Sequence, residues 1–133
     1  MNASAAMKQY KTIGVHGGVM DASPHCLVQM MMEGVLEKIA LAKGNVKRKE
    51  IANKGVNITK AINIVAGLRS SLDLQLGGEV AMNLDRLYDY MIHQLMKANA
   101  KSDEAMLDEV SGLMVDIKSS WDAIDGQEAD YGA

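Results

Sequence analysis

The chain has 133 residues, a formal net charge of -3 and a single cysteine, Cys26. This length fits one compact domain, the lone cysteine excludes an internal disulfide and a CxxC metal or redox pair, and mild acidity excludes a broad basic surface for nucleic acid. No N-terminal stretch resembles a secretion signal and no apolar run approaches the roughly 20 residues of a membrane span, so we expect a cytoplasmic protein without membrane insertion.

Helical periodicity recurs along the chain and no segment alternates like a strand, which predicts an all-α fold. Residues 1–22 are expected to form an N-terminal segment with a short helix over 3–11, whose apolar points are Tyr10, Ile13 and Val15. The tail at 126–133 is acidic and contains glycine, so we expect it to be loosely attached.

The first long helix is expected to begin at Pro24, with Ser23 as its N-cap, because proline needs no N–H partner in the first turn. It is expected to end near Lys43, at Gly44 or Asn45. Between residues 26 and 39 it is apolar almost all round, which predicts burial on more than one side.

A second long helix is predicted over residues 47–75, with one apolar face formed by Ile51, Ile58, Ile62, Val65, Leu68 and Leu72 and with Ile64 on its flank. Gly77 is expected to stop this helix in the left-handed conformation that glycine accepts. The glycine pair would then form a tight corner into the next helix.

A third helix is predicted over 79–99 and a fourth over 103–125, the fourth capped by Ser102. In the third, Tyr88 falls within the core-facing arc and Tyr90 at its edge. The apolar arcs of these two helices are Val80, Leu84, Leu87, Tyr88, Met91, Ile92 and Leu95, and then Met106, Leu107, Val110, Leu113, Met114, Ile117, Trp121 and Ile124. Four amphipathic helices with short connections predict an antiparallel four-helix bundle over residues 23–125.

The sequence holds no motif for catalysis, a metal or a cofactor, so we expect a protein that is not an enzyme and needs none of these. Carboxylate-bridged metal bundles need Glu-x-x-His on two helices, and no such motif occurs. His25 and Cys26 are neighbours that would point about 100° apart on a helix, which does not suit a nucleophile–base pair.

His93, on the polar face of the third helix, leaves open an alternative function as a phosphotransfer bundle, although the Lys-Gly that follows such histidines is missing. The basic run at residues 43–50 could contact phosphate or an acidic partner, but a solvated loop is the simpler interpretation.

Four ordered blocks of sequence resemble the flagellar secretion chaperones of the FliS type. They are Tyr10 followed by "ASPHCL", then "KAINIVAGLRSSLD", "GGEVAMNLDRLYDYMIHQLMKAN" and "EVSGLMVDIKSSWDAI". The resemblance covers about residues 7–125. Many relatives have an aromatic residue where this chain has Met32, which affects local packing rather than the fold.

This resemblance implies a cytoplasmic chaperone that binds the disordered C-terminal segment of flagellin, prevents premature polymerisation and helps to deliver it to the flagellar type III export apparatus. Flagellin would fold into helices against the bundle, and residues 1–22 would cover part of that surface in the free protein. The candidate partner-binding residues are Tyr10, Ile13 and Val15 in the cap, with Ile64, Leu68, Leu87 and Tyr90 in the groove. Exposed apolar grooves could pair two copies into a homodimer, or the cap could keep the chain monomeric.

Overall fold

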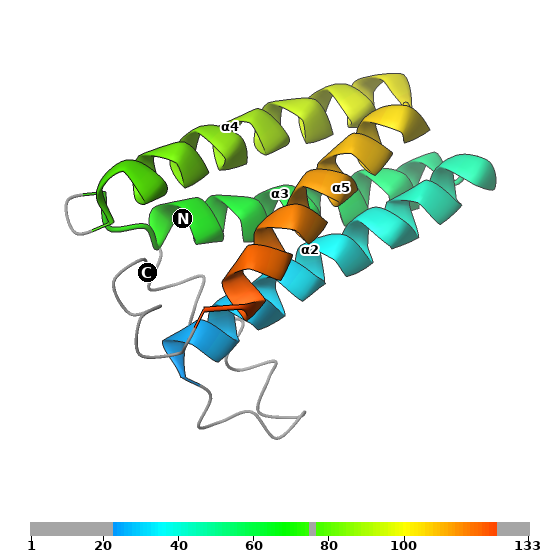
Figure 1. Cartoon of the computed structure of the whole chain (residues 1–133). Coiled ribbons are helices and arrows are strands. Elements are labelled where there is room, and N and C mark those ends of the chain that lie inside the picture. Colours follow the sequence, from blue (N-terminus) through cyan, green and yellow to red (C-terminus); the bar gives the residue numbers. More distant parts are fainter. Residues whose placement is uncertain (1–22, 75–76, 125–133) are drawn as a thin grey trace.

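The computed structural model describes residues 23–74 and 77–124, which form four helices and no strand. These are α2 (Pro24–Lys47), α3 (Ile51–Ser70), α4 (Gly78–Lys101) and α5 (Glu104–Asp122). Successive helices run in opposite directions (Figure 1), and each packs against two neighbours, α2 and α4 both lying against α3 and α5. The all-α prediction is therefore confirmed. The expected cap at 1–22 and tail at 126–133 lie outside the described residues.

The core runs the length of the bundle, and α2 contributes more buried residues than any other helix. Four methionines are fully buried with Tyr88 in the core, and they are Met31, Met32, Met91 and Met114. Methionine is flexible and polarizable, so it fills irregular space that a phenylalanine would otherwise occupy. None of the four described helices is long and apolar enough to cross a membrane.

Three residues that were predicted to face the core are exposed. Ile51, Val80 and Ile124 are 70%, 68% and 37% exposed. Each lies at or just beyond a helix end, where a residue can have the correct phase while the neighbouring helices no longer cover it. The predicted stripes are otherwise buried or half-buried.

The start of α2 was predicted correctly, but its end was not. Pro24 opens the helix, and the Ser23 hydroxyl accepts a hydrogen bond of 3.1 Å from the Cys26 N–H. The helix continues through Gly44 and Asn45 because the Asn45 amide is buried and bonded to Glu50 at 3.0 Å and to Asn57 at 2.7 Å. Lys49, with φ of 58°, makes the left-handed turn instead.

The connection between α3 and α4 differs from the predicted glycine corner. α3 ends at Ser70, since the Ser71 hydroxyl donates to the Leu68 carbonyl at 2.8 Å and competes with the helical bond. Gly77 is right-handed, with φ of -77°, and Gly78 takes the left-handed φ of 55°. Gly77 is required for another reason: a Cβ there would lie 2.5 Å from the Ala81 Cβ.

The turn from α4 to α5 exchanges the predicted roles of Ser102 and Asp103. Asp103 is the N-cap of α5 and accepts a bond of 3.2 Å from the Met106 N–H. Ser102 is left-handed and ends α4. Its hydroxyl accepts a bond of 2.6 Å from Lys54 Nζ, which also donates to the Asn99 carbonyl at 2.8 Å. This buried ammonium joins the start of α3 to the end of α4, where a cation suits the helix dipole.

Replacing Lys54 should therefore be costly. Lys54→Met keeps most of the aliphatic chain but leaves the Asn99 carbonyl without its donor, so we expect the free energy of unfolding to fall by about 1–3 kcal/mol. Urea unfolding followed by circular dichroism would measure this. The matched control is Lys60→Met on the exposed side of α3, which should change stability by less than about 0.5 kcal/mol. Equal losses in both variants would contradict the role of Lys54.

Candidate partner-binding surface

The candidate partner-binding residues do not share one groove. Leu68 is a core residue, only 1% exposed, whereas Tyr90 is 42% exposed. Ile64 and Leu87 are half-buried. The remaining three candidates, Tyr10, Ile13 and Val15, lie outside the described residues.

Ile64 lies on the side of α3 that faces α2. The Asn57 amide donates to the Asn45 side chain of α2 at 2.7 Å, and Ile64 follows Asn57 by seven residues, which is two helical turns. Leu87, in contrast, lies three residues before Tyr90, and the Tyr90 hydroxyl contacts α5. The structure therefore separates Ile64 from the pair Leu87 and Tyr90.

A polar contact joins α4 to α5 beside Leu87. The Tyr90 hydroxyl lies 3.0 Å from both carboxylate oxygens of Glu109, and Gln94 Nε2 donates to Glu109 Oε1 at 2.8 Å. The hydrogen bond to the Glu109 carboxylate raises the pKa of Tyr90, because a negative acceptor favours the protonated phenol. Sequence reasoning missed Glu109, since only the pairing of helices reveals which carboxylate meets Tyr90.

Apolar side chains continue along this side of α4 and the facing side of α5. Val80 and Leu87 are seven residues apart and therefore point the same way. On α5, Leu113 and Ile117 follow Glu109 by one and two turns and pack half-buried against the core. We define Val80, Leu84, Leu87, Leu113 and Ile117 as the α4–α5 seam. The two helices meet where α4 ends and α5 begins, and they diverge toward the start of α4 (Figure 1).

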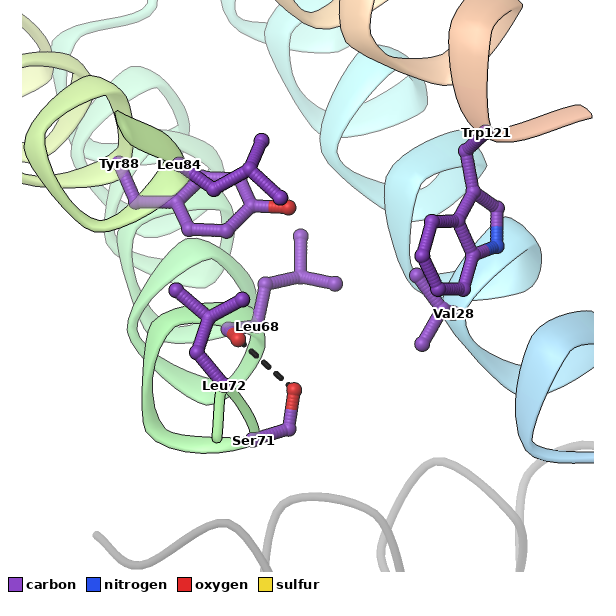
Figure 2. A pocket seen from close by; sticks show the side chains of 7 residues that line it. All are labelled: Val28, Leu68, Ser71, Leu72, Leu84, Tyr88 and Trp121. Atoms are coloured by element: carbon purple, nitrogen blue, oxygen red, sulfur yellow. Dashed lines mark hydrogen bonds between the residues drawn. The ribbon is translucent and has the colours of Figure 1, made fainter. Parts of the chain in front are cut away.

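A small pocket lies at the end of the bundle where the seam is widest. It is lined by Val28, Leu68, Ser71, Leu72, Leu84, Tyr88 and Trp121. Figure 2 shows the residues of α4, of α3 and of the segment that follows α3 on one side, and those of α2 and α5 on the other. The pocket is partly open and has a volume of about 10 Å³, which is room for about one water molecule. The pocket could therefore admit an apolar side chain only if the two helix pairs moved apart.

The Tyr88 hydroxyl points into this pocket (Figure 2). The residue is only 2% exposed, and burial raises the pKa of the phenol because the charged form would lose its hydration. Tyr88 therefore adds a neutral polar group to a lining that is mainly apolar and also contains Ser71.

Polar contacts at the pocket end join helices within the pairs. The Trp121 indole donates to the His25 carbonyl at 3.0 Å and stacks on its ring at 4.9 Å, which ties α5 to α2. Arg69 of α3 pairs with Asp85 at 2.7 Å and with Asp89 at 2.9 Å, which ties α3 to α4. Between the pairs, the pocket itself is lined mainly by apolar side chains. His25 Nδ1 is buried and has no hydrogen-bond partner among the described residues.

The structure gives little support for either alternative site, the basic run at residues 43–50 or His93. Within the basic run, Lys43 pairs with Asp108, Lys47 with Glu104 at 3.3 Å and Arg48 with Glu50 at 2.8 Å, so much of its charge is already matched by carboxylates.

His93 is exposed, and its Nδ1 lies 2.8 Å from the Asp89 carbonyl. This geometry suits an ordinary surface histidine as well as a phosphoacceptor. The described residues contain no group of three or more His, Cys, Asp or Glu side chains arranged to hold a metal ion.

Comparison with known proteins decides the family. The family model described as "Flagellar protein FliS" matches residues 6–128. The chain belongs to the FliS family. This membership confirms the resemblance seen in the four sequence blocks.

Curated relatives agree with this assignment. The chain is 51% identical over 124 residues to the flagellar secretion chaperone FliSB of Pseudomonas aeruginosa, which covers 93% of this chain and 98% of the relative. It is 41% identical to FliS of Vibrio cholerae over 90% of this chain and 88% of the relative. It is 38% identical to FliS of Salmonella typhimurium over 93% of each chain. The protein is therefore a flagellar export chaperone, and chaperone action is not an enzyme activity.

The contact between Tyr90 and Glu109 predicts how the tyrosines titrate. Glu109→Gln removes the negative acceptor, so the pKa of Tyr90 should fall back toward its ordinary value of 10.0. Phenolate absorbance recorded against pH would show this, with Tyr90→Phe identifying the component that belongs to Tyr90. Because the folded-state pKa is raised, this contact stabilises the fold below the ordinary pKa and is lost as pH rises through the raised value. An unchanged titration in Glu109→Gln would show that the contact does not form in solution.

Proposed function

We propose that this FliS-family protein is a cytoplasmic chaperone that binds the disordered C-terminal segment of flagellin along the α4–α5 seam. Binding would prevent premature polymerisation and help to deliver flagellin to the flagellar type III export apparatus. The observation that carries the proposal is a row of apolar residues on α4, on the side where α5 diverges from it. Val80 is 68% exposed and Leu87 is half-buried beside the exposed Tyr90.

The physical requirement of such a client supports this surface. A disordered segment loses conformational entropy when it orders, so a large apolar contact must offset that loss. An amphipathic helix that lies in the seam would bring apolar residues at helical spacing against Val80 and Leu87. If the two helix pairs move apart, one client side chain could extend into the pocket beneath, where Leu68 forms a wall and the Tyr88 hydroxyl offers a hydrogen bond.

Calorimetry with a peptide from the flagellin C-terminus tests the proposal. We expect 1:1 binding with a large negative heat-capacity change, because apolar surface is buried, and a coil-to-helix change in the peptide. Leu87→Glu places a charge in the seam and should weaken binding at least about tenfold, equivalent to about 1.4 kcal/mol. Absence of binding to the unmodified protein would refute the proposal.

Val115→Glu is the matched control for this experiment. Val115 is an α5 residue, 50% exposed, that follows Asp108 by two turns and so lies on the α2 side of α5, away from the seam. This variant should bind the peptide as the unmodified protein does. An equal loss in both variants would mean that the seam is not the binding surface.

Residues 1–22 are proposed to act as a cap that competes with flagellin for this surface. Deleting residues 2–18 should then increase the association rate and the affinity for the flagellin peptide, because no segment of the chain must leave first. Stopped-flow fluorescence and calorimetry would measure the two quantities. Unchanged kinetics and affinity after the deletion would exclude a competitive cap while leaving seam binding intact.

A further inference from the structure

Charge is divided unevenly between the two helix pairs. α3 and α4 carry six basic and three acidic residues, a net charge of +3, although the whole chain is acidic. α2 and α5 carry four basic and seven acidic residues, a net charge of -3. The six basic residues of the first pair are Lys54, Lys60, Arg69, Arg86, Lys97 and Lys101.

The same positive pair presents an exposed apolar patch. Ile51, Val56 and Met96 are 70%, 51% and 56% exposed, and we call these three residues the α3–α4 patch. Met96 follows Asp89 by seven residues, and Asp89 pairs with Arg69 of α3, so Met96 points toward α3.

Contacts at the start of α3 place Ile51 and Val56 at the same end of the α3–α4 pair as Met96. Lys54 bonds to the Asn99 carbonyl, so the first turns of α3 lie across from the last turns of α4. Ile51 lies one turn before Gly55, the residue that faces Asn99, whereas Val56 follows Gly55 directly and so points about 100° away, onto the outer side of α3. The three exposed side chains therefore lie over the same end of the α3–α4 pair.

The free charge at the edge of this patch is basic, because Glu50, which directly precedes Ile51, is paired with Arg48 at 2.8 Å. α3 contains no acidic residue, and both Asp85 and Asp89 of α4 are engaged by Arg69. Lys60 lies one turn after Val56 and Lys97 directly follows Met96, and both are exposed without an ion-pair partner among the described residues. An apolar surface with a positive edge suits a helix that has an apolar stripe and acidic flanks.

Gly55 lies beside the α3–α4 patch and has no side chain to fill the space there. It is an interior helix residue, where glycine costs roughly 0.5–1 kcal/mol relative to alanine. A Cβ there would meet only Asn99 Oδ1, at an ordinary 4.0 Å. The packing of the described chain therefore does not require glycine at this position, and its missing side chain leaves room for a residue from outside.

We propose that the α3–α4 patch docks an amphipathic helix with acidic flanks from a second protein. This surface is distinct from the seam, because the seam lies on the α5 side of α4 and the patch on the α3 side. Flagellin and the second protein could therefore occupy the chaperone together. The proposal does not depend on the identity of the client.

Two synthetic amphipathic peptides test the proposal by nuclear magnetic resonance of the isotope-labelled full chain. They share one leucine and methionine stripe, which is flanked by glutamates in the first peptide and by lysines in the second. We expect the glutamate peptide to shift the amide signals of residues 51–60 and 93–100 and to bind more weakly as salt rises. The lysine peptide should bind at least about tenfold more weakly.

Variants then locate the interaction. Met96→Glu should weaken binding of the glutamate peptide at least about tenfold. Gly55→Leu, which fills the space left by the missing side chain, should weaken binding to the same extent. Val115→Glu on α5 should leave binding unchanged. Equal affinity for the two peptides, or signal shifts confined to residues 80–90 and 113–124, would overturn the proposal. Neither result would affect the flagellin calorimetry, so failure here is distinguishable from failure of the proposed function.

Discussion

At its pocket end, the bundle depends on polar contacts within each helix pair and on mainly apolar contacts between the two pairs. Directional polar contacts tie α2 to α5 through Trp121 and His25, and α3 to α4 through Arg69 and its two aspartates. Across the pocket, mainly apolar side chains such as Val28 and Leu84 separate the two pairs. Apolar contact is non-directional and tolerates sliding, whereas a buried hydrogen bond is costly to leave unmade. At this end of the bundle, polar contacts therefore hold each pair together, while mainly apolar contact forms the boundary that α2 and α3 share across the pairs.

This arrangement suits a chaperone that must accept and release a client. An apolar partner can replace apolar neighbours without leaving a buried charge uncompensated. Fully buried methionines, among them Met31 and Met91, support such exchange because their side chains can change rotamer within the core. Polar contacts farther along the bundle, from Asn57 to Asn45 and from Tyr90 to Glu109, still fix how the pairs are aligned.

Sequence alone predicted what local periodicity and capping determine, which includes the four helices, the buried Tyr88 and the start of α2 at Ser23 and Pro24. The prediction that Ser102 caps α5 was wrong, because two adjacent polar residues can each cap a helix. Lys54, which is distant in the sequence, binds the Ser102 hydroxyl, and Asp103 is the cap. Sequence alone placed Ile51 and Val80 in the core because periodicity gives the phase of a helix but not where its neighbours end. Tyr90 lies at the edge of the core-facing arc as predicted, and the choice of partner helices separates Ile64 from Leu87, while the binding role of these residues stays a prediction.

Trp121 is a fluorescent probe of the boundary between the two helix pairs. It is the one tryptophan of the chain, and its ring lines the pocket while only 7% exposed. An indole in an apolar setting emits at shorter wavelength than one in contact with water, and the Trp121 ring is stacked on the His25 ring at 4.9 Å. The molecule therefore carries an intrinsic fluorophore at the place where its helix pairs would separate, and no dye or label is needed to follow that separation in real time.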